Sequence, residues 1–310
     1  MLDANNFVIK TIHGFKIYLD KKDPGISRTL IKPKFFRKWH REPEFMDIIE
    51  KEVTKGMVAF DLGANIGYVT LCLANLIGKQ GHVYAVEPSP HNFEILKKNI
   101  SANNLEDRVD AYHYAISSES GVINFNLCAE SNLHSIIKTK YTKETIEVNS
   151  VSIDDFLVDK KFPNFIKMDI EGAELQALEG INEILKKSDE SMKILMEIHP
   201  MYYSQDKFAK QLKRLFDAGF KAKYVVSAGT ARPDFFVEKG YIPDKVYTTG
   251  DWRRGVYTNI RNEDVIHACC SDFDQKVTIS PWSLIKRPYR LLNPSLQSTK
   301  IVRAIMLERA

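Results

Sequence analysis

From residue 57 onward, short apolar runs rich in β-branched and aromatic residues alternate with stretches of helical periodicity. The runs have the length of buried strands, whereas the intervening stretches repeat apolar residues every three or four positions. Strands that alternate with helices form βαβ units, which pack as a parallel sheet with helices on both faces. The sequence therefore predicts an α/β fold with a Rossmann-like, mostly parallel sheet. The expected strands are 58–63, 82–88, 109–116, 165–170, 193–198 and 221–226, and the expected helices are 67–76, 92–103, 173–187 and 207–218.

The chain divides into three predicted blocks, an N-terminal cap, a sheet-forming core and a C-terminal extension, which cover residues 1–54, 55–228 and 229–310. In the cap we expect a hairpin over 7–19 and a helix over 44–53, placed to cover an edge of the sheet. Residues 121–155 alternate polar and apolar positions and are predicted to form an antiparallel decoration beside the core. The stretch from residue 229 to residue 255 is punctuated by Pro and Gly and is predicted to be loop.

Composition excludes several classes of protein. A chain of 310 residues, 44% of them hydrophobic, can bury a large core, and a net charge of +4 is too small to indicate a nucleic-acid partner. The chain starts without a basic segment followed by an apolar run, and no apolar stretch is long enough to cross a bilayer. We therefore expect a cytoplasmic protein whose four cysteines stay reduced. The sequence indicates no oligomeric state.

The segment DLGANIG ends the first core strand and opens a helix, where sheets of this kind bind a cofactor. Gly63 allows the chain to turn sharply after Asp61, and Gly67 allows the first helical turn to lie close to a ligand. A dinucleotide fingerprint would place a glycine between these two, but Ala64 and Asn65 occupy the middle. The spacing therefore disfavours NAD.

Glu87 lies at the end of the second strand, about twenty residues beyond the glycine turn. A carboxylate at this point can accept two hydrogen bonds from the vicinal hydroxyls of an uncharged ribose. Asn92 follows at the start of the next helix, where it can flank a base. The predicted cofactor-binding residues are thus Asp61, Gly63, Ala64, Asn65, Gly67, Glu87 and Asn92.

Three segments together resemble one known family. They are REPEFMDII leading into VAFDLGANIGYVT, then VEPSPHNFEILKKNI, and finally FIKMDIEGAELQALEG, at 41–49, 58–70, 86–100 and 165–180. They resemble the FkbM family of S-adenosylmethionine-dependent methyltransferases, and the K-x-D-x-E-G-A-E core of the last segment is the most family-specific part. The resemblance implies a class-I methyltransferase sheet, S-adenosylmethionine as cofactor, and methylation of a hydroxyl on a sugar, glycan or related metabolite.

Transfer to a hydroxyl requires a general base or a metal ion that lowers the pKa of the hydroxyl. Asp169 ends the fourth strand, and Glu197 and His199 share parity at the end of the fifth, so their side chains should converge. One hypothesis places Mg²⁺ between Asp169 and Glu197. The other makes His199 the base, oriented by one of the two carboxylates. Glu42 and Glu171 are predicted to contact the acceptor.

Two other functions are weighed against methyl transfer. An NAD-dependent oxidoreductase or epimerase is disfavoured by the missing middle glycine. A non-catalytic module that retains a cofactor site is disfavoured because Gly63, Gly67, Glu87 and Asp169 are all present.

The C-terminal thirty residues are rich in cations that are interleaved with apolar residues. Such a segment can contact a membrane surface or an anionic glycan, although the solvated face of an ordinary packing helix explains it more simply. The cations are Lys286, Arg287, Arg290, Lys300, Arg303 and Arg309.

Overall fold

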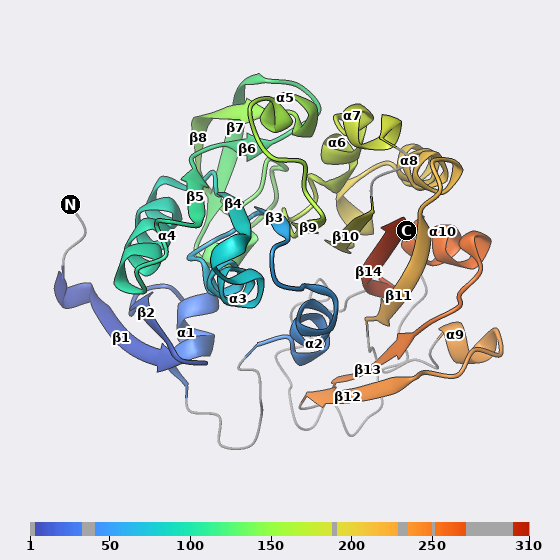
Figure 1. Cartoon of the computed structure of the whole chain (residues 1–310), viewed down its shortest axis with the longest axis horizontal. Helices are drawn as coiled ribbons and strands as arrows, with labels where there is room; N and C mark the ends of the chain where they lie inside the picture. Colours follow the sequence, from blue (N-terminus) through green and yellow to red (C-terminus); the bar gives the residue numbers. More distant parts are fainter. Residues whose placement is uncertain are drawn as a thin grey trace.

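A nine-stranded sheet forms the centre of the protein (Figure 1). The computed structural model describes residues 4–32, 41–187, 191–228, 235–249, 252–270 and 300–309. In order across the sheet the strands are β12 (Lys245–Thr249), β13 (Trp252–Tyr257), β11 (Lys221–Ser227), β14 (Val302–Arg309), β10 (Met192–Glu197), β9 (Phe165–Met168), β3 (Val58–Leu62), β4 (His82–Val86) and β5 (Val109–Tyr112). The run from β10 to β5 is entirely parallel. The predicted α/β fold with a mostly parallel sheet is confirmed.

Strand β14 lies inside the sheet, antiparallel to both of its neighbours β10 and β11. Leu195 of β10 faces Met306, and Val225 of β11 faces Ile305. The block 229–310, expected as an extension, therefore supplies a central strand. The prediction of loop up to residue 255 is also wrong, because this stretch contains helix α9 (Phe235–Glu238) and strands β12 and β13.

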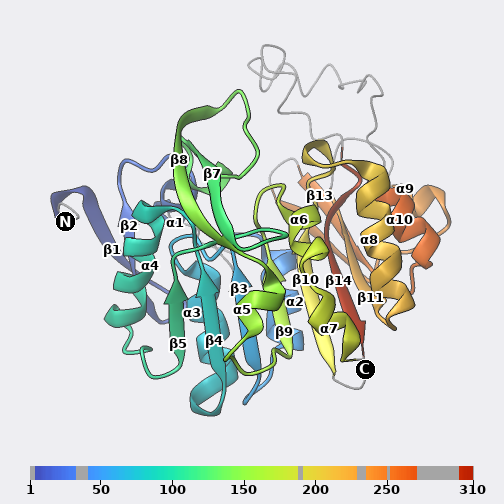
Figure 2. The ribbon, with the colours of Figure 1, turned by 90° about the horizontal axis from the view of Figure 1, so that it is seen from above.

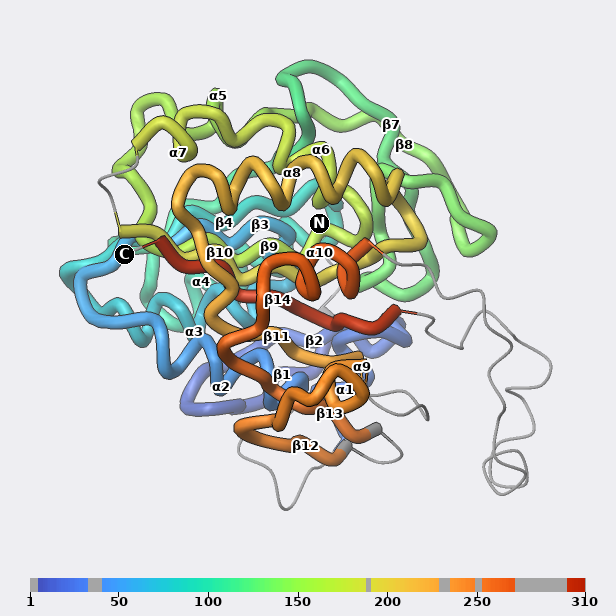
Figure 3. The backbone as a smooth tube through the Cα atoms, turned by 90° about the vertical axis from the view of Figure 1, so that its right-hand side faces the viewer, coloured from blue at the N-terminus to red at the C-terminus, as the bar shows by residue number. Residues whose placement is uncertain are grey.

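Helices cover both faces of the sheet (Figure 1). Successive residues of a strand point to opposite faces, so Phe60 packs with the helices of one face while its neighbour Ala59 packs with those of the other. The first face carries α5 (Ile153–Leu157), α6 (Glu174–Glu179), α7 (Asn182–Lys186), α8 (Gln205–Asp217) and α10 (Asn262–Cys270), and the second carries α2 (Pro43–Glu52), α3 (Tyr68–Ile77) and α4 (Pro90–Ala102). Helices α8 and α10 lie side by side in front of β14 (Figure 3). The single helix expected over 173–187 is two helices, which are separated at Gly180 and Ile181.

The N-terminal block contains the predicted hairpin, formed by β1 (Phe7–Ile12) and β2 (Phe15–Asp20), followed by α1 (Ile26–Ile31). The hairpin packs along α4, where the amide of Tyr18 donates to Asn99 Oδ1 at 2.6 Å and the amide of Lys16 donates to Asn103 Oδ1 at 2.9 Å. The hairpin thus covers a helix, whereas α2 of the same block contacts the edge strand β12, where Lys245 Nζ and the Tyr247 hydroxyl lie 2.7 and 2.6 Å from Asp47 Oδ2. Short 3₁₀ helices complete the described elements at η1 (Ala4–Asn6), η2 (Gly78–Gln80), η3 (Ser131–Leu133) and η4 (Pro200–Tyr202).

The predicted antiparallel decoration is a three-stranded sheet in which β8 (Thr142–Val151) pairs with β7 (Gly121–Cys128) and with β6 (Ala115–Ile116). We call residues 121–151 the β7–β8 arm. The arm projects away from the main sheet beside β3, β4 and β5 (Figure 2). Within the described ranges, no helix combines the length and the apolar character needed to cross a membrane.

The placement of β14 gives a first prediction. Leu307 is fully buried in the core, so Leu307→Ala should lower the free energy of unfolding by about 2–5 kcal/mol through lost packing and a residual cavity. Urea unfolding followed by circular dichroism measures this change. The matched control is Val122→Ala on β7, where the side chain is 62% exposed and the change should stay within about 0.5 kcal/mol. Equal losses at the two positions would contradict a central β14.

Candidate active site

A buried ion pair supports the turn that follows β3. Lys167 Nζ lies 3.0 Å from Asp61 Oδ1 and donates to the carbonyl of Gly63 at 2.7 Å, while Thr70 Oγ1 donates to Asp61 Oδ2 at 2.6 Å. Burial alone would lower the pKa of Lys167, but Asp61 and Asp169 outweigh it and raise that pKa. Asp61, which was expected to bind the cofactor, therefore lies beneath the turn and fixes its shape.

Glu87 is held rigidly beside this turn. Its Oε2 accepts the amide of Asn65 at 2.8 Å, and its Oε1 accepts the amide of Ser89 at 2.9 Å. Burial raises the pKa of Glu87 to about 7, and these amide hydrogen bonds oppose the rise. Asn92 Nδ2 approaches Glu87 Oε1 at 3.4 Å, whereas Asn92 Oδ1 is buried without a hydrogen-bond partner among the described residues.

One pocket joins this turn to the ends of β9 and β10. It encloses about 840 Å³, including space open to solvent. The predicted residues that line it are Gly63, Ala64, Asn65, Glu87, Glu42, Asp169 and Glu171. Gly67 and Asn92 do not line it; Gly67 is favoured instead by its left-handed backbone (φ +91°), and a Cβ there would require Leu96 Cδ1, 2.7 Å away, to shift.

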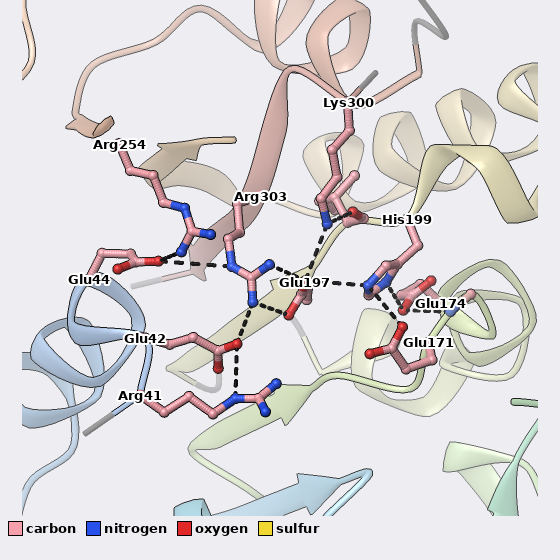
Figure 4. A network of polar contacts seen from close by, with 12 residues as sticks. Arg41, Glu42, Glu44, Glu171, Glu174, Glu197, His199, Arg254, Lys300 and Arg303 are labelled. Atoms are coloured by element: carbon pink, nitrogen blue, oxygen red, sulfur yellow. Dashed lines mark hydrogen bonds and ion pairs between the residues drawn. The ribbon is translucent and has the colours of Figure 1, made fainter. Parts of the chain in front are cut away.

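Glu197 is bound by two cations at the start of β14 (Figure 4). Arg303 Nη1 lies 2.8 Å from Oε1 and Nη2 donates to Oε2 at 3.1 Å, while Lys300 Nζ donates to Oε1 at 3.2 Å. Burial alone would raise the pKa of Glu197, but Arg303 and Lys300 hold it well below its usual range. Glu197 is thus an ionised structural partner outside the lining of the pocket.

His199 lies between carboxylates, as Figure 4 shows. Its Nδ1 is 2.9 Å from Glu174 Oε1, and its Nε2 is 3.3 Å from Glu197 Oε1 and 3.4 Å from Glu171 Oε2. Burial and Lys300 would lower the pKa of His199, but the three carboxylates raise it well above its usual value. The strand parity correctly brings Glu197 and His199 together, yet both ring nitrogens are engaged and neither is left to accept a substrate proton.

Asp169 and Glu171 are the two carboxylates that face the pocket near these groups. Asp169 Oδ1 is buried with no hydrogen-bond partner in the described part of the chain. Glu171 adopts a left-handed backbone (φ +47°), and its carbonyl accepts Ser135 Oγ at 2.6 Å. Burial, reinforced by Glu197, raises the pKa of Asp169 to about 6. Burial, opposed by His199, raises the pKa of Glu171 to about 8.

Glu42 also lines the pocket, and it connects the segment before α2 to strand β14. It accepts Arg303 Nη2 at 2.5 Å and lies 3.1 Å from Arg41 Nε. Burial alone would raise the pKa of Glu42, but Arg41 and Arg303 lower it. The predicted acceptor contacts Glu42 and Glu171 therefore share one pocket wall with Asp169.

The C-terminal cations that the structure describes lie on or next to strand β14 and not on the solvated face of a helix: Lys300 and Arg309 are buried, and the side chain of Arg303 is 16% exposed. Lys300 and Arg303 bind Glu197, and Arg309 donates to the carbonyls of Ile184 and Lys187 at 3.1 and 2.5 Å. The other expected cations, Lys286, Arg287 and Arg290, lie outside the described residues.

A divalent ion does not fit the predicted pair. Mg²⁺ between Asp169 and Glu197 would have to displace Arg303 and Lys300 from both oxygens of Glu197. Asp169, Glu171 and His199 offer ligand atoms within 4.8 Å of one another. However, a metal binds the neutral imidazole, and the carboxylates around His199 favour the protonated ring. The residues at this end of the pocket therefore do not match a divalent metal site.

Sequence reasoning missed one wall of the pocket, which the β7–β8 arm supplies. Ser131, Asn132 and His134 line it, and the carbonyl of Ser131 accepts Asn65 Nδ2 at 3.1 Å. The sequence gives one signal for this wall, which is the position of 121–155 between two core strands. The polar residues at the tip of the hairpin cannot be distinguished by sequence from those of an ordinary loop.

The sheet order, with one antiparallel strand between β10 and β11, and the carboxylate at the end of β4 define the fold of the class-I methyltransferases. The chain belongs to the FkbM family: residues 61–222, just over half of its length, match the methyltransferase FkbM domain.

Two relatives and one solved structure illustrate the similarity. Hexuronic acid methyltransferase AglP of Haloferax volcanii is 27% identical over 163 residues, which cover 51% of this chain and 62% of that protein. 31-O-demethyl-FK506 methyltransferase FkbM of Streptomyces tacrolimicus is 26% identical over 164 residues, 43% of this chain and 62% of that protein. The chain thus spans about three fifths of the length of either relative. The crystal structure of methyltransferase FkbM from Methylobacillus flagellatus has 19% identity and a TM-score of 0.40, covering 66% of this chain and 43% of that one.

The cofactor turn gives a second prediction. Gly63 has φ +79°, and a Cβ there would clash with the backbone carbonyl of Asp169. Gly14 has a similar φ of +86° with nothing within 4 Å of a Cβ, so Gly14→Ala isolates the backbone cost of about 1–2 kcal/mol. Gly63→Ala should lower the free energy of unfolding by at least about 2 kcal/mol more. Urea unfolding of both variants measures the difference, and similar losses would show that the turn can move aside.

Proposed function

We propose that the protein transfers the methyl group of S-adenosylmethionine to a hydroxyl of a sugar, glycan or related metabolite. One observation carries the proposal: in a member of the FkbM family, a single pocket is lined both by Glu87 beside the glycine turn and by the carboxylates of Asp169 and Glu171. The first group suits a nucleoside and the second suits a hydroxyl that must lose a proton.

The donor side fits S-adenosylmethionine. Glu87 is oriented by the amides of Asn65 and Ser89, so its carboxylate is fixed before a ribose arrives. Gly63 and Ala64 line the same pocket where the chain leaves β3. S-adenosylmethionine would supply an electrophilic methyl group on a sulfonium. The protein's share of catalysis is then to align the acceptor, exclude water and accept one proton.

The acceptor side offers Asp169 and Glu171 as the base. As the acceptor oxygen bonds to the methyl carbon and the carbon–sulfur bond breaks, the hydroxyl proton passes to this carboxylate pair. Raised pKa values suit the task, because a base works best when its pKa lies near the working pH. His199 and Glu174 act as positioning residues that orient Glu171 from the buried side.

Two relatives of this chain support a hydroxylated acceptor without fixing its identity. One is a hexuronic acid methyltransferase, and the other is a 31-O-demethyl-FK506 methyltransferase. A sugar hydroxyl and a hydroxyl on a polyketide-like compound need the same base and the same alignment. The proposal therefore names the acceptor as a hydroxylated metabolite and favours a saccharide.

The donor assignment predicts that the wild-type protein binds S-adenosylmethionine and not NAD in isothermal titration. Glu87→Gln should weaken this binding about tenfold or more, since a charge-assisted hydrogen bond to the ribose is lost. The matched control is Glu94→Gln on α4, where the exposed carboxylate forms an ion pair with Lys97 at the surface, and affinity should not change. Binding of NAD alone would favour an oxidoreductase, and binding of neither would favour a non-catalytic module.

The base assignment predicts a pH dependence. A carboxylate accepts the proton only when ionised, so kcat should rise with pH between about 6 and about 8 and level off above. Glu171→Gln should reduce kcat about 100-fold and remove the upper step of the profile. Release of S-adenosylhomocysteine measures kcat, with the saccharide selected by a one-methyl gain in a mass-spectrometric panel.

Two controls accompany this profile. Glu119→Gln changes an exposed carboxylate away from the pocket and should leave the profile intact. A chelator should not alter kcat of the wild-type enzyme. Loss of turnover with the chelator, or an unchanged profile in Glu171→Gln, would refute the carboxylate base.

A further inference from the structure

The β7–β8 arm forms a roof over the pocket that is fastened on both sides. On the donor side, the carbonyl of Ser131 accepts Asn65 Nδ2 at 3.1 Å and Asn92 Nδ2 at 3.4 Å. On the acceptor side, Ser135 Oγ donates to the carbonyl of Glu171 at 2.6 Å. The residues of the arm that line the pocket are Phe125, Ser131, Asn132, His134 and Ile136.

His134 is the arm residue whose hydrogen-bonding character is fixed by the fold. Its Nδ1 accepts the amide of Cys128 at 3.0 Å. A neutral imidazole carries one donor and one acceptor nitrogen, so an accepting Nδ1 places the proton on Nε2. Its ring stands edge to face against Phe125, with 6.2 Å between centroids and 85° between planes, which holds its orientation.

The environment keeps His134 neutral. Burial lowers its pKa to about 4, although the nearby carboxylate of Asp23 opposes the change. At neutral pH the side chain therefore presents an uncharged N–H. Within the described residues Nε2 has no hydrogen-bond partner, while His134 lines the pocket. A neutral N–H can donate a hydrogen bond to an uncharged ring nitrogen or to a sugar oxygen. A carboxylate would be bound more strongly by a charged donor such as arginine.

The position of His134 points to the donor half of the pocket. It follows Ser131 by three residues, and Ser131 is anchored on the two asparagines that contact Glu87. The same pocket wall contains Tyr114 and Ile116, which follow β5 on the side of the sheet away from Glu197. A nucleoside held by Glu87 would lie beneath this part of the roof.

We propose that His134 donates a hydrogen bond from Nε2 to the nucleoside of the methyl donor and that the β7–β8 arm thereby contributes to donor specificity. The proposal rests on the proposed function, because it takes S-adenosylmethionine as the donor. The β7–β8 arm could lie beside the core sheet without contacting the methyl donor, so this binding role is an additional one.

Calorimetric titration with S-adenosylhomocysteine tests the hydrogen bond. His134→Phe keeps a ring against Phe125 but removes the N–H, and it should weaken binding about fivefold to tenfold. His134→Gln restores an N–H donor at a similar reach and should recover most of the affinity. The matched control is His82→Phe, which changes a histidine paired with Asp110 at the start of β4 and should leave the affinity unchanged.

Nuclear magnetic resonance of the wild-type protein tests the same point without a substitution. Ring ¹⁵N signals should show His134 as the Nε2–H tautomer in the free protein, and S-adenosylhomocysteine should shift the Nε2 signal. An Nδ1–H tautomer, or signals and variants that do not respond while the wild type binds the ligand, would overturn the role of His134 alone. A wild type that fails to bind S-adenosylhomocysteine at all would overturn the proposed function as well.

Discussion

The acceptor half of the pocket depends on the ion pairs that Arg303 makes with Glu197 and Glu42. These groups come from the end of β10, the start of β14 and the segment before α2, which are far apart in the sequence. Buried ion pairs add little net stability. Removing one partner, however, leaves an uncompensated buried charge, so conformations in which Arg303 is separated from these carboxylates are strongly disfavoured. The segment before α2 and the start of β14 are thereby held next to the carboxyl end of β10. A pocket wall that contains Glu42 exists only because β14 is in place.

The parallel half of the sheet could be predicted because its signal is local. Each of β3, β4, β9 and β10 is a compact apolar run followed by a helix, and chain order then limits how such units pack. Strand β14 gives no such signal, since it inserts between β10 and β11 through antiparallel pairing with partners far away in the sequence. From the sequence alone, the charges of this strand indicate the solvated face of a helix. Pairing over a long sequence separation cannot be deduced from periodicity, which explains why 229–310 was expected to be an extension.

The candidate site shows the same division. Gly63, Asn65, Glu87 and Asp169 were found because each ends a strand or belongs to the turn after one, and strand ends meet at one edge of the sheet. Parity placed Glu197 and His199 correctly beside each other. It could not reveal that Arg303, Lys300 and Glu174 occupy their polar atoms, since these partners come from other elements. His134 of the β7–β8 arm lines the pocket and is not among the residues predicted from sequence, because its neighbours there also come from other elements.

Three residues that line the pocket have a left-handed backbone. Among the described non-glycine residues with positive φ are Asn65 (φ +52°), Glu171 (φ +47°) and Glu42 (φ +46°), and all three line it. Each left-handed residue costs about 1–2 kcal/mol, so the surroundings must compensate for the strain. They do so with contacts already described: Asn65 is bound to Glu87 and Ser131, Glu171 to Ser135 and His199, and Glu42 to Arg303. The donor turn, the roof and the acceptor wall are thus connected to one another by the contacts of these three residues and their partners.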